Sequence, residues 1–511
     1  MSEARITWVG GPVLKACATG PFSIFEALAV GERRLLGEVI QLRGNELVAQ
    51  VYEDTTGLEP GVTVVGLERP LSVTLGPNLL GGIFDGLLRP LSRATDYQIQ
   101  PGAAERSIAR HRLEFAVRNG DILSAGAVFA RTVAPRPQSL LVPPWASGRV
   151  EALVEPGEYR DDETLLVLVD DTGRRHELTM QHDWPVRRSR PVRERLGVNA
   201  PMITGQRILD TLFPVARGGR AALPGGFGTG KTVLQEALAK WCDADVIVYV
   251  GCGERGNEMA EVLDEFPRLE DPRTGRPLAE RTVIIANTSN MPVAAREASI
   301  YTAITVAEYF RDQGLNVALM ADSTSRWAEA LREVSGRLGE LPGEAGYPAY
   351  LSSRLAEFYE RAARVTSLAG AEGSVTIIGA ISPPSGDFSE PVTLHTKRYV
   401  RCFWALDRQR AQARFYPAIH PLQSYGSDVQ ELADWWKRSG NPDWLVQRQR
   451  VLELLEAQAH LERMARIVGR DALPAQQQVR LLCADLVNEG FLRQSSFSKV
   501  DRFCSPQRQV A

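Results

Sequence analysis

A glycine-rich segment followed by a lysine and a threonine carries the clearest chemical signal in this 511-residue chain. Residues 225–232 match the pattern G-x-x-x-x-G-K-[ST], and a helical pattern continues over 233–241. Glycines let backbone N–H groups wrap closely around a phosphate, and the start of the helix adds the positive end of its dipole. We predict that Lys231 reaches the β- and γ-phosphates of a nucleotide and that the Thr232 hydroxyl coordinates Mg²⁺. The predicted nucleotide-binding residues of this segment are Gly225, Gly226, Phe227, Gly228, Thr229, Gly230, Lys231, Thr232 and Val233.

An acid at the end of an apolar run is the predicted second partner of the metal ion. Residues 316–321 read Asn-Val-Ala-Leu-Met-Ala and are followed by Asp322, which predicts a strand that ends in a carboxylate. An aspartate after an apolar run is common, so this interpretation depends on the phosphate-binding segment elsewhere in the chain. At the C-terminal edge of such a strand, Asp322 can hold the water shell of a magnesium ion.

A polar loop after the strand predicted at 245–250 offers a residue that could orient a water molecule. The loop reads Gly-Cys-Gly-Glu-Arg over 251–255, and ligand sites of open α/β sheets collect in loops of this kind. We predict that Glu254 positions the attacking water, with Arg255 as a neighbouring charge. The residues alone leave open that Glu254 caps a helix and that Arg255 lies on the surface. We expect Cys252 to pack rather than react.

The secondary structure that positions these candidate residues can also be predicted from the sequence, and it differs along the chain. Apolar strands separated by helical patterns predict a parallel sheet covered by helices in the middle of the chain. Short β-type runs with turn signals at the N-terminus predict a small antiparallel barrel. The C-terminal part has helical spacing without strands, with helices expected at 451–467 and 476–489. The predicted division is a barrel at 1–70, a connecting segment at 71–110, an inserted β-rich module at 111–183, a nucleotide-binding domain at 184–426 and a helical domain at 427–511.

Composition excludes several classes of protein. A net charge of −3, a hydrophobic content of 44% and a charged content of 24% argue against a nucleic-acid-binding or disordered chain. The six cysteines contain no Cys-x-x-Cys pair, which favours reduced thiols over a disulfide or zinc framework. Apolar runs are far shorter than a bilayer requires and the N-terminus opens no signal peptide, so we expect a cytoplasmic location.

Several of these segments together resemble the catalytic A subunit of V-type and A-type rotary ATPases. Gly-Cys-Gly-Glu-Arg-Gly-Asn-Glu-Met at 251–259 and Ala-Asp-Ser-Thr-Ser-Arg-Trp at 321–327 are examples, and the similarity covers nearly the whole chain. The segments that carry it are 184–188, 224–233, 251–259, 289–301, 321–333, 346–351, 382–393 and 403–407.

The resemblance implies a RecA-like P-loop α/β core with an N-terminal β-barrel, an inserted β-rich bulge and a C-terminal helical domain. It implies Mg²⁺-dependent hydrolysis or synthesis of ATP from ADP, coupled to proton or sodium transport. Partners would be a non-catalytic B subunit in an alternating A₃B₃ ring, central shaft subunits and a peripheral stalk. The complex would sit on the cytoplasmic face of a membrane and contact it only through its ion-translocating sector.

The resemblance also implies roles for individual residues. Lys231 and Thr232 would bind phosphate and magnesium, Glu254 would position water, Arg255 would contact the γ-phosphate region and Asp322 would be the acid beside the metal. An arginine would enter the site from the B subunit. The adenine ring would lie between Tyr416 and Phe497, although ordinary core packing of both aromatics stays an alternative.

The chain departs from the family pattern at three places. Gly226 stands where the family usually has proline, and Ala345 replaces a usual second acid. The chain also ends soon after Asp501, whereas the family normally continues through further helices. A decoupled or structural paralogue of the catalytic subunit is therefore an alternative, and a Rho-type nucleic-acid motor, which shares the RecA-like core, is a more distant one.

Overall fold

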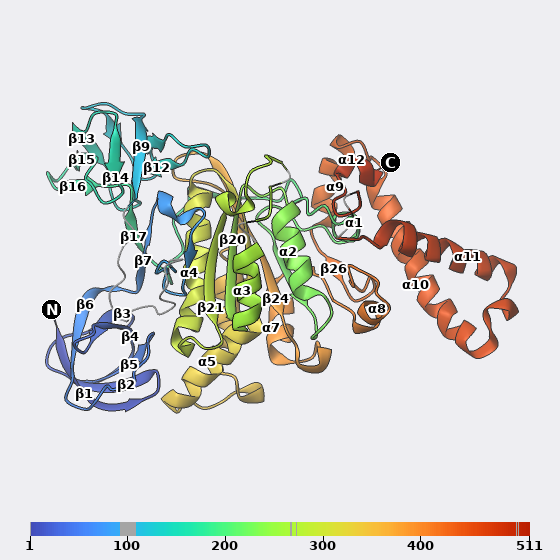
Figure 1. Ribbon diagram of the computed structural model, residues 1–511, viewed down its shortest axis with the longest axis horizontal. Coiled ribbons are helices and arrows are strands. Elements are labelled where there is room, and N and C mark those ends of the chain that lie inside the picture. Colours follow the sequence, from blue (N-terminus) through green and yellow to red (C-terminus); the bar gives the residue numbers. More distant parts are fainter. Residues whose placement is uncertain are drawn as a thin grey trace.

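The computed structural model describes residues 2–91, 109–265, 268–271, 273–496, 498 and 500–510. Figure 1 shows an elongated molecule with two β-rich parts at one end, a central sheet covered by helices, and a helical hairpin at the other end. This architecture confirms the predicted fold class, since barrel, β-rich insertion, α/β core and helical C-terminus are all present.

The N-terminal barrel is closed by six strands in the order β1-β2-β5-β4-β3-β6. Alternation in β1 places Ala4 and Ile6 inside while Glu3 and Arg5 face out, which is the period of two expected for a half-buried strand. The interior is filled by apolar side chains such as Leu28 and Val39. The strands are β1 (Glu3–Gly10), β2 (Val13–Ala18), β3 (Glu26–Val30), β4 (Leu35–Arg43), β5 (Glu46–Val51) and β6 (Thr63–Pro70).

The segment after the barrel does more than connect two domains. It forms β7 (Ser72–Leu75), the short helix η1 (Pro77–Leu79) and β8 (Ile83–Phe84). Strand β8 pairs in parallel with β21 at the edge of the central sheet. A two-residue strand shows no periodicity in the sequence, which is why the prediction treated 71–110 as a connection.

The inserted β-rich module consists of two four-stranded antiparallel sheets, in the orders β10-β13-β15-β16 and β12-β11-β9-β14. Their facing sides enclose an apolar core that includes Phe129 and Leu168. The chain then returns through β17 (His182–Pro185), which pairs with β7. The strands of the module are β9 (Arg110–Phe115), β10 (Ile122–Leu123), β11 (Val128–Thr132), β12 (Ser139–Leu141), β13 (Gly148–Leu153), β14 (Glu158–Arg160), β15 (Leu166–Val169) and β16 (Arg175–Leu178).

The central sheet runs in the order β26-β25-β19-β24-β22-β20-β21-β8, and β18 and β23 extend it off this path. Strands β19, β24, β22, β20 and β21 are parallel, and both faces are covered, so β20 is buried along almost its whole length. The strands are β18 (Glu194–Leu196), β19 (Arg220–Pro224), β20 (Val246–Glu254), β21 (Thr282–Thr288), β22 (Asn316–Asp322), β23 (Ala363–Thr366), β24 (Glu372–Ile381), β25 (Cys402–Phe403) and β26 (Tyr425–Gly426).

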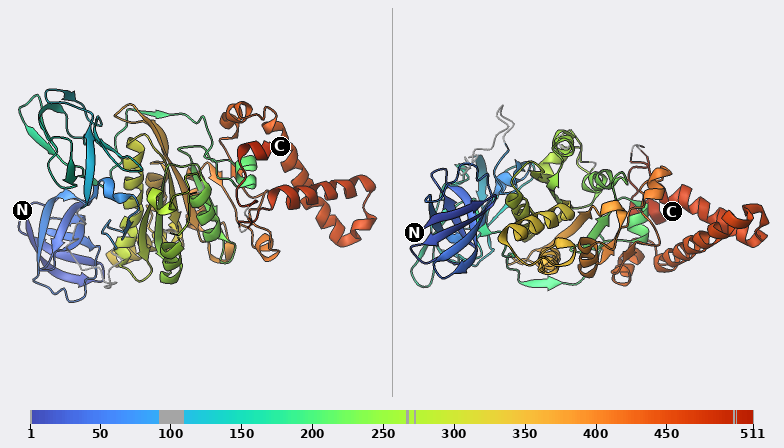
Figure 2. Two further views of the ribbon diagram at one scale, coloured as in Figure 1. Left: turned by 45° about the horizontal axis from the view of Figure 1, so that its top comes forward. Right: turned by 90° about the horizontal axis from the view of Figure 1, so that it is seen from below.

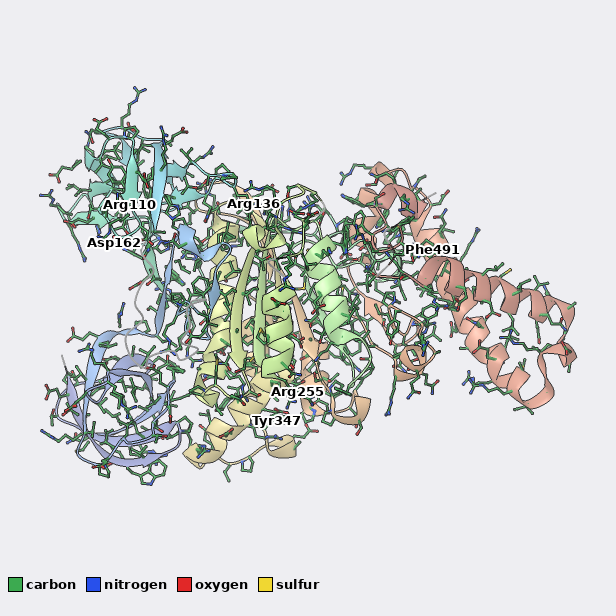
Figure 3. The ribbon with its side chains drawn as sticks, viewed as in Figure 1. Arg110, Arg136, Asp162, Arg255, Tyr347 and Phe491 are labelled. Carbon is green, nitrogen blue, oxygen red and sulfur yellow. The ribbon has the colours of Figure 1, made fainter. Side chains whose placement is uncertain are left out.

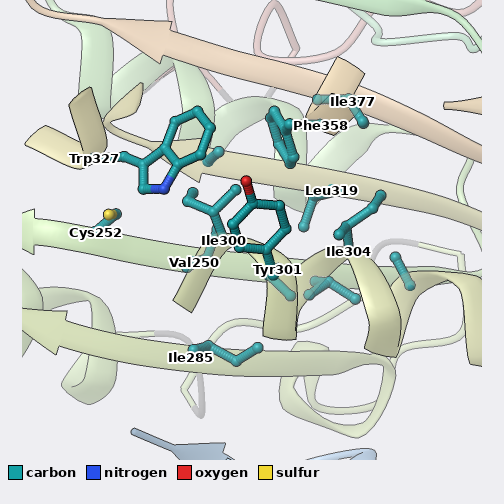
Figure 4. Close-up of a cluster of buried hydrophobic side chains, with 14 of the residues drawn as sticks. Val250, Cys252, Ile285, Ile300, Tyr301, Ile304, Leu319, Trp327, Phe358 and Ile377 are labelled. Carbon is teal, nitrogen blue, oxygen red and sulfur yellow. The ribbon is translucent and has the colours of Figure 1, made fainter. Parts of the chain in front are cut away.

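Helices lie on both faces of this sheet (Figures 1 and 2). On the face covered by α4 and α5, Tyr301 and Trp327 pack edge to face over Val250 and Ile285 (Figure 4). The other face packs on α2 through Leu234. The helices of this part are α1 (Arg207–Leu212), α2 (Lys231–Trp241), α3 (Gly256–Glu265), η2 (Leu278–Arg281), α4 (Val293–Asp312), α5 (Thr324–Leu338), η3 (Glu344–Gly346), α6 (Leu351–Tyr359), η4 (Pro384–Gly386), α7 (Pro391–Tyr399) and α8 (Arg408–Gln412).

The C-terminal part is helical, as predicted. Its long hairpin of α10 and α11 projects away from the sheet (Figure 1). Both helices differ in length from the predicted ones, and a π-helix, η6, directly continues α11. None of the helices in the described part of the chain is long and apolar enough to cross a membrane. The helices are α9 (Val429–Arg438), α10 (Trp444–Val468), η5 (Arg470–Ala472), α11 (Ala475–Leu486), η6 (Val487–Leu492) and α12 (Pro506–Val510).

Candidate active site

The predicted phosphate-binding segment forms the turn between β19 and α2. The Gly225 N–H donates to the Ile381 carbonyl at 3.0 Å, which anchors the start of the turn to the neighbouring strand β24. The Thr229 hydroxyl donates to the Gly226 carbonyl at 2.8 Å and closes the turn on itself. Gly230 has a φ of 81°, which an L side chain rarely adopts, so glycine is needed at this position. The loop is therefore held by both strand and turn contacts at the N-terminus of α2.

Lys231 lies at the centre of this site. Its ammonium nitrogen is 3.2 Å from Oδ1 of Asp322 and also donates a hydrogen bond to the Ser382 hydroxyl. Asp322 is the last residue of β22, and Ser382 directly follows β24. Because parallel strands present their C-terminal ends at one edge of the sheet, residues from three strand ends meet here.

Glu254 lines the same cavity, but its local structure differs from the prediction. The sequence suggested a loop after residue 250, whereas β20 continues to Glu254 and pairs with β21 up to Thr288. Gly251 is paired on both sides, with Ala286 of β21 and with Asp322 of β22, so the strand continues past residue 250 despite the glycine. A bulge at Gly253, with a φ of 73°, shifts the register just before Glu254.

Gly253 is tightly surrounded. A Cβ atom at this position would lie 2.8 Å from the Arg296 side chain and 2.9 Å from Cβ of Arg326. The bulge that sets the direction of Glu254 therefore depends on glycine at this position.

A cavity of about 500 Å³ joins the predicted catalytic residues. Phe227 is 89% exposed at its rim, and the Arg255 guanidinium lies 5.8 Å from the centre of the Phe227 ring. Figure 3 shows Arg255 at the same end of the central domain as Tyr347. The lining residues are Gly225, Gly226, Phe227, Gly228, Gly230, Lys231, Thr232, Val233, Glu254, Arg255, Arg326, Ser382, Pro383, Pro384 and Ser385.

A second cavity, of about 620 Å³, shares Gly228, Gly230 and Val233 with the first and extends towards the C-terminal segment. We call this second cavity the base pocket, because it contains Tyr416, one of the two residues expected to contact the adenine ring. Tyr416 lines it and is 42% exposed, so this ring is available to a ligand. A Cβ atom on Gly230 would lie 3.2 Å from the Tyr416 ring, which shows how closely the phosphate loop approaches this aromatic. The other predicted aromatic, Phe497, lies outside the described residues.

The oxygen ligands beside Lys231 fit a magnesium ion. The Asp322 side chain is 2% exposed, and within the described residues its Oδ1 accepts no hydrogen bond, so one carboxylate oxygen is left to the ammonium and to a metal. Thr232, whose side chain carries a hydroxyl, lines the cavity together with Lys231. Mg²⁺ is commonly held by one or two protein oxygens together with substrate phosphates. The described residues contain no group of three or more His, Cys, Asp and Glu side chains that could hold a metal without such a substrate.

Two buried side chains beside the site, Tyr249 and Cys252, remain neutral. Burial, and then the charge of Asp322, raises the pKa of the Tyr249 hydroxyl well above its ordinary value. Burial raises the pKa of the Cys252 thiol to about 12, in agreement with the expectation that this residue packs. Neither side chain can therefore supply a nucleophile near neutral pH.

The sequence analysis did not assign a role to two residues of the cavity. Ser382 contacts Lys231, and Arg326, from α5, lines the cavity beside Glu254. Both lie in segments that carried the family resemblance: Ser382 directly follows β24, and Arg326 lies in α5, which begins shortly after the end of β22. A polar residue shortly after the end of a central parallel strand is thus the signal that could have identified them.

Comparison with known protein families gives four matches. Residues 205–426 match the ATP synthase alpha/beta family, nucleotide-binding domain, and residues 433–511 match the C-terminal domain of V and A type ATP synthase. Residues 90–187 match the ATP synthase alpha/beta subunit barrel-sandwich domain, and residues 6–68 match the beta-barrel domain of the same family.

Curated relatives match over almost the whole chain. A "V-type ATP synthase alpha chain" from Halothermothrix orenii is 52% identical, with 99% of this chain and 88% of the relative covered. An A-type ATP synthase subunit from Methanopyrus kandleri is 51% identical, with 99% and 87% covered. The corresponding A-type subunit from Thermococcus onnurineus is also 51% identical, with 99% and 88% covered.

Among solved structures, the ATPase EscN of the type III secretion system of enteropathogenic E. coli superimposes with a TM-score of 0.70. The alignment covers 99% of this chain and 98% of that chain at 22% identity, so it shows a shared fold only.

Proposed function

This chain belongs to the ATP synthase alpha/beta family, with relatives that are subunits of A-type and V-type ATP synthases, and we propose that it is the ATP-hydrolysing or ATP-forming subunit of such a rotary enzyme. One observation carries the proposal for the site. Lys231, Glu254 and Asp322 converge at one edge of the parallel sheet, next to a glycine-rich turn.

The phosphates of ATP would occupy the cavity beside α2. The Lys231 ammonium would interact with the β- and γ-phosphates, and backbone N–H groups at the start of α2 would donate to phosphate oxygens. We propose that Thr232 and Asp322 hold Mg²⁺ together with the phosphates. When bound, this ion would neutralise negative charge on the transferred phosphoryl group.

Glu254 would accept a hydrogen bond from the attacking water and orient it in line with the bond to the leaving β-phosphate oxygen. A γ-phosphoryl group carries charge on three oxygens, so cations around it stabilise the transition state. Arg255 and Lys231 line the cavity on this chain. A further arginine would enter from a neighbouring B subunit.

The proposed assembly follows from the family. The chain would alternate with B subunits in an A₃B₃ ring around central shaft subunits, with a peripheral stalk. Movement of the helical domain during each cycle would couple ATP turnover to proton or sodium movement through separate membrane subunits. The complex would lie on the cytoplasmic face of the membrane.

ATP turnover by the chain assembled with its B subunit tests this function. We expect Mg²⁺-dependent hydrolysis that Lys231→Ala abolishes and that Glu254→Gln lowers by at least about a hundredfold. Glu254→Gln should still bind ATP, because the substitution keeps the shape of the side chain. Lys240→Ala is the matched control, since Lys240 is in the last turn of the same helix α2 and does not line the cavity. Turnover of Glu254→Gln near the parent rate would contradict the assignment of Glu254.

A further inference from the structure

One arginine outside the phosphate loop holds the wall of the base pocket in place. Arg207 is the first residue of α1, and its side chain is 11% exposed. Its Nη1 donates to Asp501 Oδ1 at 2.6 Å and its Nη2 donates to the Arg493 carbonyl at 2.6 Å. Its Nε donates to the Phe491 carbonyl. Every donor nitrogen of the guanidinium is thus directed at the C-terminal segment, where Phe491 marks the junction with the helical hairpin (Figure 3).

The backbone of Arg207 takes part in the same contact. Its N–H donates to Oε1 of Gln494 at 2.8 Å, and Nε2 of Gln494 donates to the Gly205 carbonyl at 2.8 Å. The Gln494 N–H in turn donates to the Tyr416 carbonyl at 2.8 Å. Gln494 is 1% exposed, so these bonds are shielded from water. They join α1, the C-terminal segment and the aromatic of the base pocket.

Asp501 completes the connection. Its Oδ1 accepts from Arg207, and its Oδ2 accepts from the Ser495 N–H at 2.8 Å. Burial opposes ionisation of Asp501, but the hydrogen bonds from Arg207 and Ser495 outweigh it, and the net effect is a lowered pKa. Asp501, Arg493, Gln494 and Ser495 all line the base pocket.

Interactions within α1 do not explain why an arginine stands at position 207. A cation in the first turn of a helix interacts unfavourably with the helix dipole, and α1 has only six residues. The same cation is favourable at the end of η6, where Phe491 and the following Arg493 present carbonyl oxygens. The contact with the C-terminal segment therefore accounts for this residue.

We propose that Arg207 is a positioning residue for nucleotide binding, which holds Arg493, Gln494, Ser495 and Asp501 in place beside Tyr416 so that the pocket holds the base. This inference rests on the proposed function, because it assumes that the nucleotide's phosphates bind at Lys231. Arg207 does not line the phosphate cavity, so its contribution concerns the base and not the phosphates.

The affinities of the full chain for Mg-ADP and for Mg-pyrophosphate should be measured at equilibrium. Pyrophosphate has no adenine base, so the comparison distinguishes contacts to the base from contacts to the phosphates. Arg207→Met should weaken ADP binding about tenfold or more, the size of effect expected for lost charge-assisted hydrogen bonds, and change pyrophosphate binding less than about twofold. Arg207→Lys keeps one charged donor and should recover part of the affinity for ADP. Arg217→Met is the matched control, because it breaks a 2.6 Å ion pair with Asp243 in the same domain, and neither of these residues lines the base pocket.

Asp501→Asn provides an independent test, since it keeps the acceptor oxygen and removes the charge. We expect a loss of ADP affinity of about threefold, with pyrophosphate unaffected. Unchanged ADP binding in both Arg207→Met and Asp501→Asn, or an equal loss of ADP and pyrophosphate binding, overturns the inference. If the parent chain binds neither ligand, it is the proposed function that fails.

Discussion

The Lys231 ammonium lies 3.2 Å from Oδ1 of Asp322, and this contact reaches from the turn after β19 across β24 to the end of β22. The Asp322 side chain is 2% exposed, and burying a lone carboxylate is costly. The ammonium therefore compensates the acid when phosphates are absent. The phosphates of a bound nucleotide would compete for the same lysine, so we expect binding of nucleotide and of metal at Asp322 to be coupled.

Asp322→Asn should weaken this coupling. The substitution keeps the size of the side chain but removes the charge that would attract Mg²⁺, so we expect the Mg²⁺ concentration for half-maximal turnover to rise at least about tenfold. Magnesium titrations of ATP turnover in the assembled ring measure this. Asp264→Asn, at an exposed position of α3, is the control and should behave as the parent. An unchanged Mg²⁺ requirement for Asp322→Asn would contradict the assignment of Asp322 to the metal site.

Gly253→Ala should impair turnover more than nucleotide binding. An added Cβ atom meets Arg296 and Arg326 and strains the positive φ, so the bulge must shift and move Glu254. Because small displacements of catalytic groups are costly, we expect kcat to fall at least about tenfold with KM changed less. Gly256→Ala is the control, since nothing lies within 4 Å of its added Cβ. Parent-like kcat for Gly253→Ala means that the bulge does not control Glu254.

Arg187→Met should destabilise the folded chain, because Arg187 links the barrel to the central domain. Arg187 bonds to Glu38 of the barrel at 2.9 Å and to Glu297 of α4 at 3.0 Å, and both acids are almost fully buried. Without the arginine, two buried carboxylates lose their cation, which costs about 3–5 kcal/mol of unfolding free energy. Arg188→Met, at the next, exposed position, should cost less than about 1 kcal/mol. Thermal and denaturant unfolding measure the difference, and equal effects of the two substitutions contradict this role.

Stability should fall in acid through His182. Burial, and then the charge of Arg190, lowers the pKa of His182 well below its ordinary value, and Nη1 of Arg190 lies 2.9 Å from its Nε2. The neutral ring is stabilising above the unfolded-state pKa of about 6.5, and this contribution is lost as pH falls below that value, because the unfolded chain takes up the proton more readily. The melting temperature of the parent should therefore fall more steeply between pH 7 and 5 than that of His182→Gln. His460→Gln, at an exposed site, should keep the parent slope.

Thiol reagents should distinguish the cysteines by burial. Cys17 and Cys483 are exposed, whereas Cys242, Cys252, Cys402 and Cys504 are buried. Burial raises the pKa of Cys252 to about 12, so only about one molecule in ten thousand carries its thiolate at pH 8. We expect two thiols to react rapidly in the native chain and all six after denaturation, measured by chromogenic thiol titration. Rapid native modification of Cys252 contradicts its packed position.

The local order of residues was sufficient to predict the phosphate loop. The turn from 225 to 230, Lys231 and Thr232 are contiguous, and a contiguous turn between a strand and a helix depends mainly on short-range conformational preferences. Asp322 could be predicted because an apolar run places its final residue at a sheet edge. The same reasoning placed Glu254 at this edge of the sheet, although it ended β20 four residues too early, because the pairing of β20 with β21 is not visible in the sequence.

Other parts of the site depend on residues that are far apart in the sequence. Arg207 meets Asp501, Lys231 meets Ser382, and Arg187 joins Glu38 to Glu297. No periodicity or motif marks such pairs, because each partner alone is an ordinary polar residue. The sequence by itself determined the glycine-rich turn that is proposed to hold phosphate and the residue that ends a parallel strand, since these are local properties of the chain. Only the tertiary structure decided which distant side chains neutralise and orient them, because burial and the choice of hydrogen-bond partner arise when separate elements pack together.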